Sequence, residues 1–138
     1  MTAERDAYDA LCAYTLARGD AEFIHQHVVD AFTAQHANDR TKPIAITFAL
    51  VGLYLVVERK RSGRQVQQVH VLLGRRKRQW PPFVLPRNRG ALTAVDVMTN
   101  REGPERDRAI LAWCEDVWAA YAGSHRTIRD LLVTYDLT

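Results

Sequence analysis

Three histidines on separate predicted helices are the residues best suited to chemistry. His27, His70 and His125 each fall on the apolar stripe of a different predicted helix. Three imidazoles that enter one core could bind a divalent metal ion and leave one coordination position open for water or a substrate. Asp30 follows His27 by about one helical turn and could be a further ligand or a hydrogen-bond acceptor for a coordinated imidazole. These four residues form the candidate metal site.

The alternative role for these histidines is structural. Each would then lie in the core and bond to a backbone carbonyl, a carboxylate or a tyrosine, because a place on an apolar stripe does not bring three helices to one point. The other histidines do not extend the set. His25 points nearly opposite to His27 at about 100° per residue, and His36 lies near a helix C-terminus, where the helix dipole favours a cationic imidazole.

Positive charge is concentrated in the middle third of the chain. The net charge is +3, but no carboxylate occurs between Arg59 and Val95. Such a segment could bind a phosphate-bearing partner, and Trp80 or Phe83 beside it could stack on a base. The candidate anion-binding residues are Arg59, Lys60, Arg61, Arg64, Arg75, Arg76, Lys77, Arg78, Arg87 and Arg89. Their partner would be nucleic acid or an acidic protein, although no known recognition motif accompanies them.

The basic segment also has a structural explanation. Its two densest clusters end predicted helices, where cations complement the helix dipole. The remaining charge could be a solvated face that pairs with the acidic first third of the chain, within one molecule or across a homodimer. The sequence leaves this alternative open beside anion binding.

Composition and length indicate an ordinary globular protein. The chain has 138 residues, of which 47% are hydrophobic and 25% charged, so one domain spanning 1–138 with a substantial core is expected. No signal peptide is recognisable, and the longest apolar run is too short for a membrane span of roughly 18 residues. Cys12 and Cys114 form no metal-ligand spacing. We therefore expect a cytoplasmic protein with reduced cysteines and no membrane association.

Helical spacing of apolar residues and capping signals define the elements that must position these groups. Asp20 is a candidate N-cap, and Ser62 with Gln65 forms a capping box. Isolated Gly52, in the middle of a helix, indicates a close helix crossing. The predicted helices cover 4–17, 21–37, 43–60, 64–79, 94–99 and a long segment from Pro104. Gly123–Ser124 either kinks this long helix or separates a last helix at 125–136.

The apolar segment at 43–57 organises the predicted fold. It lacks the polar positions of a surface helix, so other helices must cover it on all sides. Three prolines within residues 81–86 exclude a helix there and predict an extended strap over 80–92, which Trp80, Phe83 and Leu85 could fix to the bundle. The expected fold class is an all-α, compact bundle of about five to six helices around the buried helix 43–60.

Several stretches of the sequence resemble one family of small bacterial proteins known only as a domain of unknown function. They are FIHQHVVDAFTAQH (23–36), TKPIAITFALVGLYL (41–55), GRQVQQVHVLLGRRKRQWPPFVLP (63–86), RGALTAVDVM (89–98) and RDRAILAWCEDVW (106–118). This resemblance covers nearly the whole chain and implies no particular activity. More remotely, a small bundle with several histidines resembles the DinB/YfiT-type proteins, which hold a metal through three histidines, although the H-x-x-x-H pair usual in that group is absent here.

Overall fold

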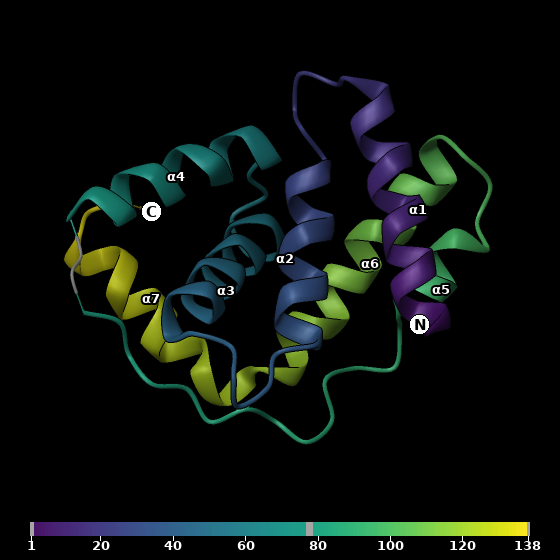
Figure 1. Ribbon diagram of the computed structural model, residues 1–138. Helices are drawn as coiled ribbons and strands as arrows, with labels where there is room; N and C mark the ends of the chain where they lie inside the picture. The colour runs from purple at the N-terminus through teal and green to yellow at the C-terminus, as the bar shows by residue number, and fades with distance from the viewer. Residues whose placement is uncertain (1, 77–78, 138) are drawn as a thin grey trace.

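The computed structural model describes residues 2–76 and 79–137, and in this part of the chain it contains helices and no strand. The predicted all-α fold class is therefore confirmed. None of the described helices is long and apolar enough to cross a membrane. The elements, shown in Figure 1, are α1 (Ala3–Arg18), α2 (His25–Gln35), α3 (Pro43–Val57), α4 (Gly63–Arg76), α5 (Ala94–Met98), α6 (Pro104–Ala120), the 3₁₀ helix η1 (Ala122–Ser124) and α7 (His125–Thr134).

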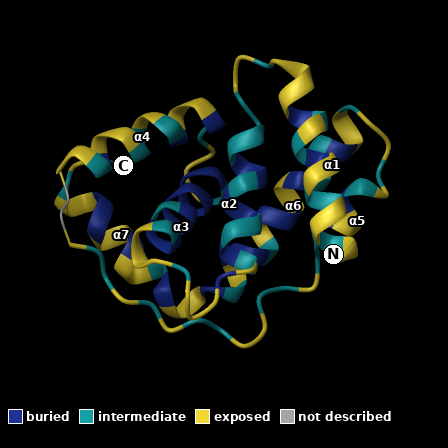
Figure 2. Cartoon of the chain, in the orientation of Figure 1, coloured by how far each residue is buried: buried dark blue, intermediate teal, exposed yellow. Residues whose placement is uncertain are grey.

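Helix α3 forms the centre of the bundle, as its apolar sequence predicts. Every residue from Ala49 to Val56 is buried. Helices α2, α4, α6 and α7 pack against it. Figure 2 shows α3 largely in the colour of buried residues, whereas α4, α6 and α7 each keep an exposed side. The hydrophobic effect thus explains why the amphipathic helices surround this one.

Helix α3 ends at Val57, three residues before the predicted end at Lys60. Lys60 adopts a left-handed backbone conformation with φ of 55°, and the Arg61 amide donates to the Leu55 carbonyl at 2.9 Å. A residue in the left-handed conformation just beyond a helix is a common way to end the helix and turn the chain away. A glycine would have marked this end in the sequence, but lysine occupies the left-handed position. This turn places Lys60 and Arg61 at one end of the bundle.

The predicted close crossing at Gly52 is confirmed. A Cβ atom on Gly52 would lie 1.8 Å from Oδ2 of Asp30 and 2.6 Å from its Cγ. Helices α2 and α3 therefore cross with the Asp30 carboxyl group directly against the Gly52 backbone. Only glycine fits at this position while Asp30 lies opposite it.

Helix α2 begins at His25, later than the predicted start at Ala21. Residues 20–24 form a turn in which Phe23 has φ of 55° and the Asp20 carboxylate accepts a hydrogen bond from the Ile24 amide. The turn is held by α4, since the Arg64 amide donates to the Glu22 carbonyl at 2.9 Å. Figure 1 shows the α1–α2 connection next to the start of α4. Contacts between distant segments therefore prevail here over the local helix signal.

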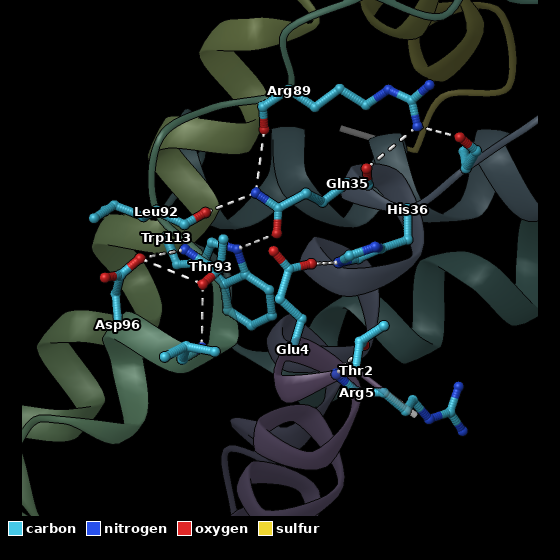
Figure 3. Close-up of polar contacts among 12 residues, drawn as sticks. Thr2, Glu4, Arg5, Gln35, His36, Arg89, Leu92, Thr93, Asp96 and Trp113 are labelled. Atoms are coloured by element: carbon cyan, nitrogen blue, oxygen red, sulfur yellow. Dashed lines mark hydrogen bonds and ion pairs between the residues drawn. The ribbon is translucent and has the colours of Figure 1, made fainter.

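The strap over 80–92 is extended, as the prolines predict, and Trp80, Phe83 and Leu85 pack against the core. Its far end is fixed by polar contacts, which Figure 3 shows. The Gln35 amide donates to the carbonyls of Arg89 and Leu92, and the Gln35 side-chain oxygen accepts from Trp113 at 3.0 Å. One glutamine of α2 thus joins the strap to α6.

Candidate functional site

Two of the three candidate metal-binding histidines have structural partners. His70 donates from Nε2 to the Phe48 carbonyl at 2.8 Å and stacks on the Phe48 ring. His125 donates from Nε2 to the Trp118 carbonyl at 2.6 Å and stacks on that indole with ring centroids 3.7 Å apart. Both imidazoles therefore fill the structural role that the sequence left open.

His27 and Asp30 differ from these histidines because burial leaves polar atoms of both without partners. His27 is 5% exposed and Asp30 is 3% exposed. Nδ1 of His27 and Oδ2 of Asp30 are the buried side-chain nitrogen and oxygen atoms that lack a hydrogen bond within the described chain. Burial lowers the pKa of the His27 imidazole to about 4 and raises the pKa of the Asp30 carboxyl well above its ordinary value. The His27 imidazole is therefore neutral near pH 7, and burial favours the protonated form of the Asp30 carboxyl.

The four candidate metal ligands do not form one centre. Among residues 2–76 and 79–137, no group of three or more histidine, cysteine, aspartate and glutamate side chains could hold a metal ion. His70 faces Phe48 of α3, and His125 lies against the end of α6, whereas His27 lies in the first turn of α2. Metal binding stays a prediction without a ligand cluster behind it.

Several residues of the basic segment bind parts of the protein itself. Arg89 is half-buried and its guanidinium donates to the carbonyls of Pro86, Gln35 and Ala37. Arg76 donates to the Tyr135 carbonyl at 2.9 Å, and Arg64 lies over the Phe23 ring. These three arginines stabilise the strap, the C-terminal end and the α1–α2 connection. Their charge is explained by the fold.

The other predicted anion-binding residues are not used in this way. Arg59, Lys60, Arg75 and Arg87 are exposed, and Arg61 is half-buried. No ion pair involves any of the five among the described residues. Lys77 and Arg78 lie outside the described residues. Nucleic acid, an acidic protein or a second copy of the chain as partner stays a prediction.

A cavity of about 570 Å³ lies at the end of the bundle where Lys60 and Arg61 emerge. We call it the His27 pocket. Its lining residues are Arg18, Asp20, Ala21, Glu22, Ile24, His27, Val56, Val57, Lys60, Arg61, Ser62, Gly63, Gln65, Asp107, Leu111 and Glu115. They come from the C-terminal ends of α1 and α3, the α1–α2 and α3–α4 connections, the starts of α2 and α4, and residues 107–115 of α6. The volume is within the range of small-molecule sites, roughly 300–1,000 Å³.

The charges around the His27 pocket are mostly unpaired. Arg18 and Asp107 form an ion pair with each other. Glu22, Lys60 and Glu115 make neither an ion pair nor a side-chain hydrogen bond with the described part of the chain, although the pocket contains both signs of charge. The pocket thus combines unpaired charged groups at its lining with the buried His27 imidazole.

Sequence reasoning identified His27, Asp30, Lys60 and Arg61 but assigned them to two unrelated sites. The pocket that joins three of them went unpredicted. Glu22 and Glu115 were also missed, because a lone carboxylate beside a turn or on a helix carries no signal of its own. The available signal was the position of His27 next to the acidic α1–α2 connection.

Comparison with known proteins places the chain in a family. The model of the family of unknown function (DUF5946) matches residues 5–122. The chain belongs to this family. The match includes every lining residue of the His27 pocket and ends before His125. No curated protein and no solved structure matches the chain. The expected resemblance to a domain of unknown function is therefore confirmed for DUF5946, and neither of these two searches adds support for the DinB/YfiT similarity.

Proposed function

We propose that this DUF5946 protein binds a small organic molecule with an anionic group in the His27 pocket. The observation behind the proposal is a buried imidazole that lines a ligand-sized cavity and has no hydrogen-bond partner in the described chain. An unsatisfied buried polar group costs roughly 1–3 kcal/mol of stability. Nδ1 is enclosed by the protein, so a ligand in the cavity would bond to the part of the His27 ring that stays accessible.

The pocket residues have complementary roles in this proposal. His27 is neutral, so one ring nitrogen donates and the other accepts a hydrogen bond. Lys60 and Arg61 have no ion pair among the described residues and would bind the anionic group. Leu111 and Val57 supply apolar surface for the organic part of the ligand.

Cys114 does not contribute a nucleophile to this site. It is fully buried, its Sγ lies 3.6 Å from the His27 carbonyl, and burial raises the pKa of its thiol. A thiol of this kind is unreactive because the thiolate is the nucleophile.

A thermal-shift screen with a library of small organic acids, zwitterionic acids among them, tests the proposal. Compounds that bind in the pocket are expected to raise the melting temperature of the wild-type protein, because a ligand that binds only the folded state stabilises it. The shift should be absent in His27→Leu. It should persist in His36→Leu, since His36 is an exposed histidine paired with Glu4. A library without any stabilising member, or equal shifts in wild type and His27→Leu, would reject the proposal.

A further inference from the structure

The charged groups of the His27 pocket point to a more specific ligand. Lys60 and Arg61 enter the lining from the α3–α4 connection, whereas Glu115 enters from α6 and Glu22 from the α1–α2 connection. Glu22, Lys60 and Glu115 are exposed and Arg61 is half-buried, so their charged groups are accessible to a ligand. Here no ion pair joins any of the four, either with each other or elsewhere in the described chain.

Other charged residues nearby are engaged and cannot explain this arrangement. Arg18 pairs with Asp107, and Glu58 accepts hydrogen bonds from Arg129 and Trp118. Asp20 accepts from the Ile24 amide. The unpaired groups are thus the two cations of one connection and the two glutamates on other elements. His27, which is 5% exposed, lies between these elements in the first turn of α2.

On the premise that the His27 pocket binds a small molecule, we propose that this molecule is a zwitterion with a carboxylate or phosphate at one end and an ammonium group at the other. Lys60 and Arg61 bind the anionic end. Glu115 and Glu22 bind the ammonium end, and His27 forms a hydrogen bond with a polar group between them.

Electrostatics give the physical reason for discrimination against simpler ligands. A ligand with only a negative charge leaves Glu115 and Glu22 without a cation and is repelled by them. A ligand with only a positive charge is likewise repelled by Lys60 and Arg61. Like charges placed together in this way oppose binding and thereby confer specificity. A zwitterion satisfies both sets of groups.

Two sets of probes with matched chain length test the inference. The first contains aminocaproate, caproate and hexylamine, and the second contains γ-aminobutyrate, butyrate and butylamine. Affinities are measured by NMR titration at constant ionic strength, since salt screens these interactions. In at least one set, the zwitterion is expected to bind about tenfold more tightly than its carboxylate and its amine, with shifts of the His27 ring signals.

Variants assign each end of the probe to its partner. Glu115→Gln should weaken binding of the zwitterion while binding of the carboxylate stays the same or improves. Lys60→Gln should weaken both. Glu105 is on the same helix as Glu115 but outside the His27 pocket, and Lys42 precedes α3 at the end away from Lys60. Glu105→Gln and Lys42→Gln therefore serve as controls and should change the affinity of neither the zwitterion nor the carboxylate.

The outcomes separate this inference from the proposed function. A carboxylate that binds as tightly as its zwitterion would overturn the zwitterion and leave a pocket for anions. An amine that binds as tightly would overturn it in favour of a cation site. If no probe binds, the inference of a zwitterionic ligand is also wrong. The proposed function is decided separately, by the organic-acid screen and its His27→Leu control.

Discussion

Burial has opposite consequences for the protons of His27 and Asp30, two residues one turn apart on α2. Removal from water favours the neutral form of each group, so it releases a proton from the imidazole and retains one on the carboxyl. The pKa of His27 falls to about 4, and that of Asp30 rises well above its ordinary value. Nδ1 of His27 and Oδ2 of Asp30 have no hydrogen-bond partner in the described chain that would reduce the free-energy cost of burying them. Both groups therefore lower the stability of the folded protein.

The lowered pKa of His27 predicts a specific dependence of stability on pH. In the unfolded chain, histidine titrates near 6.5, so between that pH and about 4 the unfolded state binds the proton and the folded state does not. His27 therefore destabilises the fold progressively as pH falls through this window. From pH 7 to pH 4, wild type should lose about 3 kcal/mol more unfolding free energy than His27→Leu.

Urea denaturation of both proteins across this pH range measures the difference. Asp30 is present in both proteins, so its own titration cancels in the comparison. Parallel pH profiles would show that His27 takes up its proton as easily in the folded protein as in the unfolded chain. At pH 7, His27→Leu should also be the more stable protein, by about 1 kcal/mol, because it removes an unsatisfied buried group.

The crossing of α2 and α3 is the decisive feature at the scale of elements. Gly52 lacks the side chain that would collide with Asp30, and it therefore permits a carboxyl group to lie between two helices. The cost is local, since glycine in a helix interior is about 1 kcal/mol less favourable than alanine. The same contact keeps Asp30 out of water.

A double-mutant cycle tests this contact. Gly52→Ala should destabilise the protein by roughly 2 kcal/mol or more, because its Cβ would overlap the Asp30 carboxyl and force the helices apart. In the Asp30→Ala background, the same change should cost much less, because the carboxyl is absent and the remaining Cβ of residue 30 would lie 3.3 Å from the new Cβ. Additive effects in chemical denaturation would show that the two residues do not compete for this space.

The strap links distant parts of the molecule and divides the basic segment into two kinds of residue. Arg89 donates to three carbonyls, two of them at the end of α2 and after it, whereas Arg87 is exposed. Figure 1 shows the strap running along the outside of the bundle to α5. A basic residue in this segment can therefore be part of the architecture, and its charge alone does not indicate a partner.

Neighbouring arginines provide a matched test of this distinction. Arg89→Ala should lower the unfolding free energy by roughly 2–3 kcal/mol, because buried carbonyls lose a charged donor, and should increase amide exchange across the strap. Arg87→Ala should leave both quantities nearly unchanged. Equal effects of the two substitutions would contradict a structural role that is specific to Arg89.

Much of the architecture could be predicted because its signals are local. The capping box of Ser62 and Gln65 is present, with reciprocal hydrogen bonds at 2.9 and 3.2 Å. Proline positions excluded a helix from the strap, and the uninterrupted apolar run identified the central helix. The predicted helix ends were wrong where Lys60 and Phe23 adopt left-handed backbone conformations, which their residue types do not predict.

The sequence by itself determined the all-α class and the central position of α3, because periodicity, capping and apolar content act within one segment. The tertiary structure alone decided which histidine would lack a partner. His70 and His125 meet carbonyls, whereas His27 meets the pocket where five elements converge. The pocket brings together residues that are far apart in the sequence, between Arg18 and Glu115, and no local pattern specifies how their segments pack.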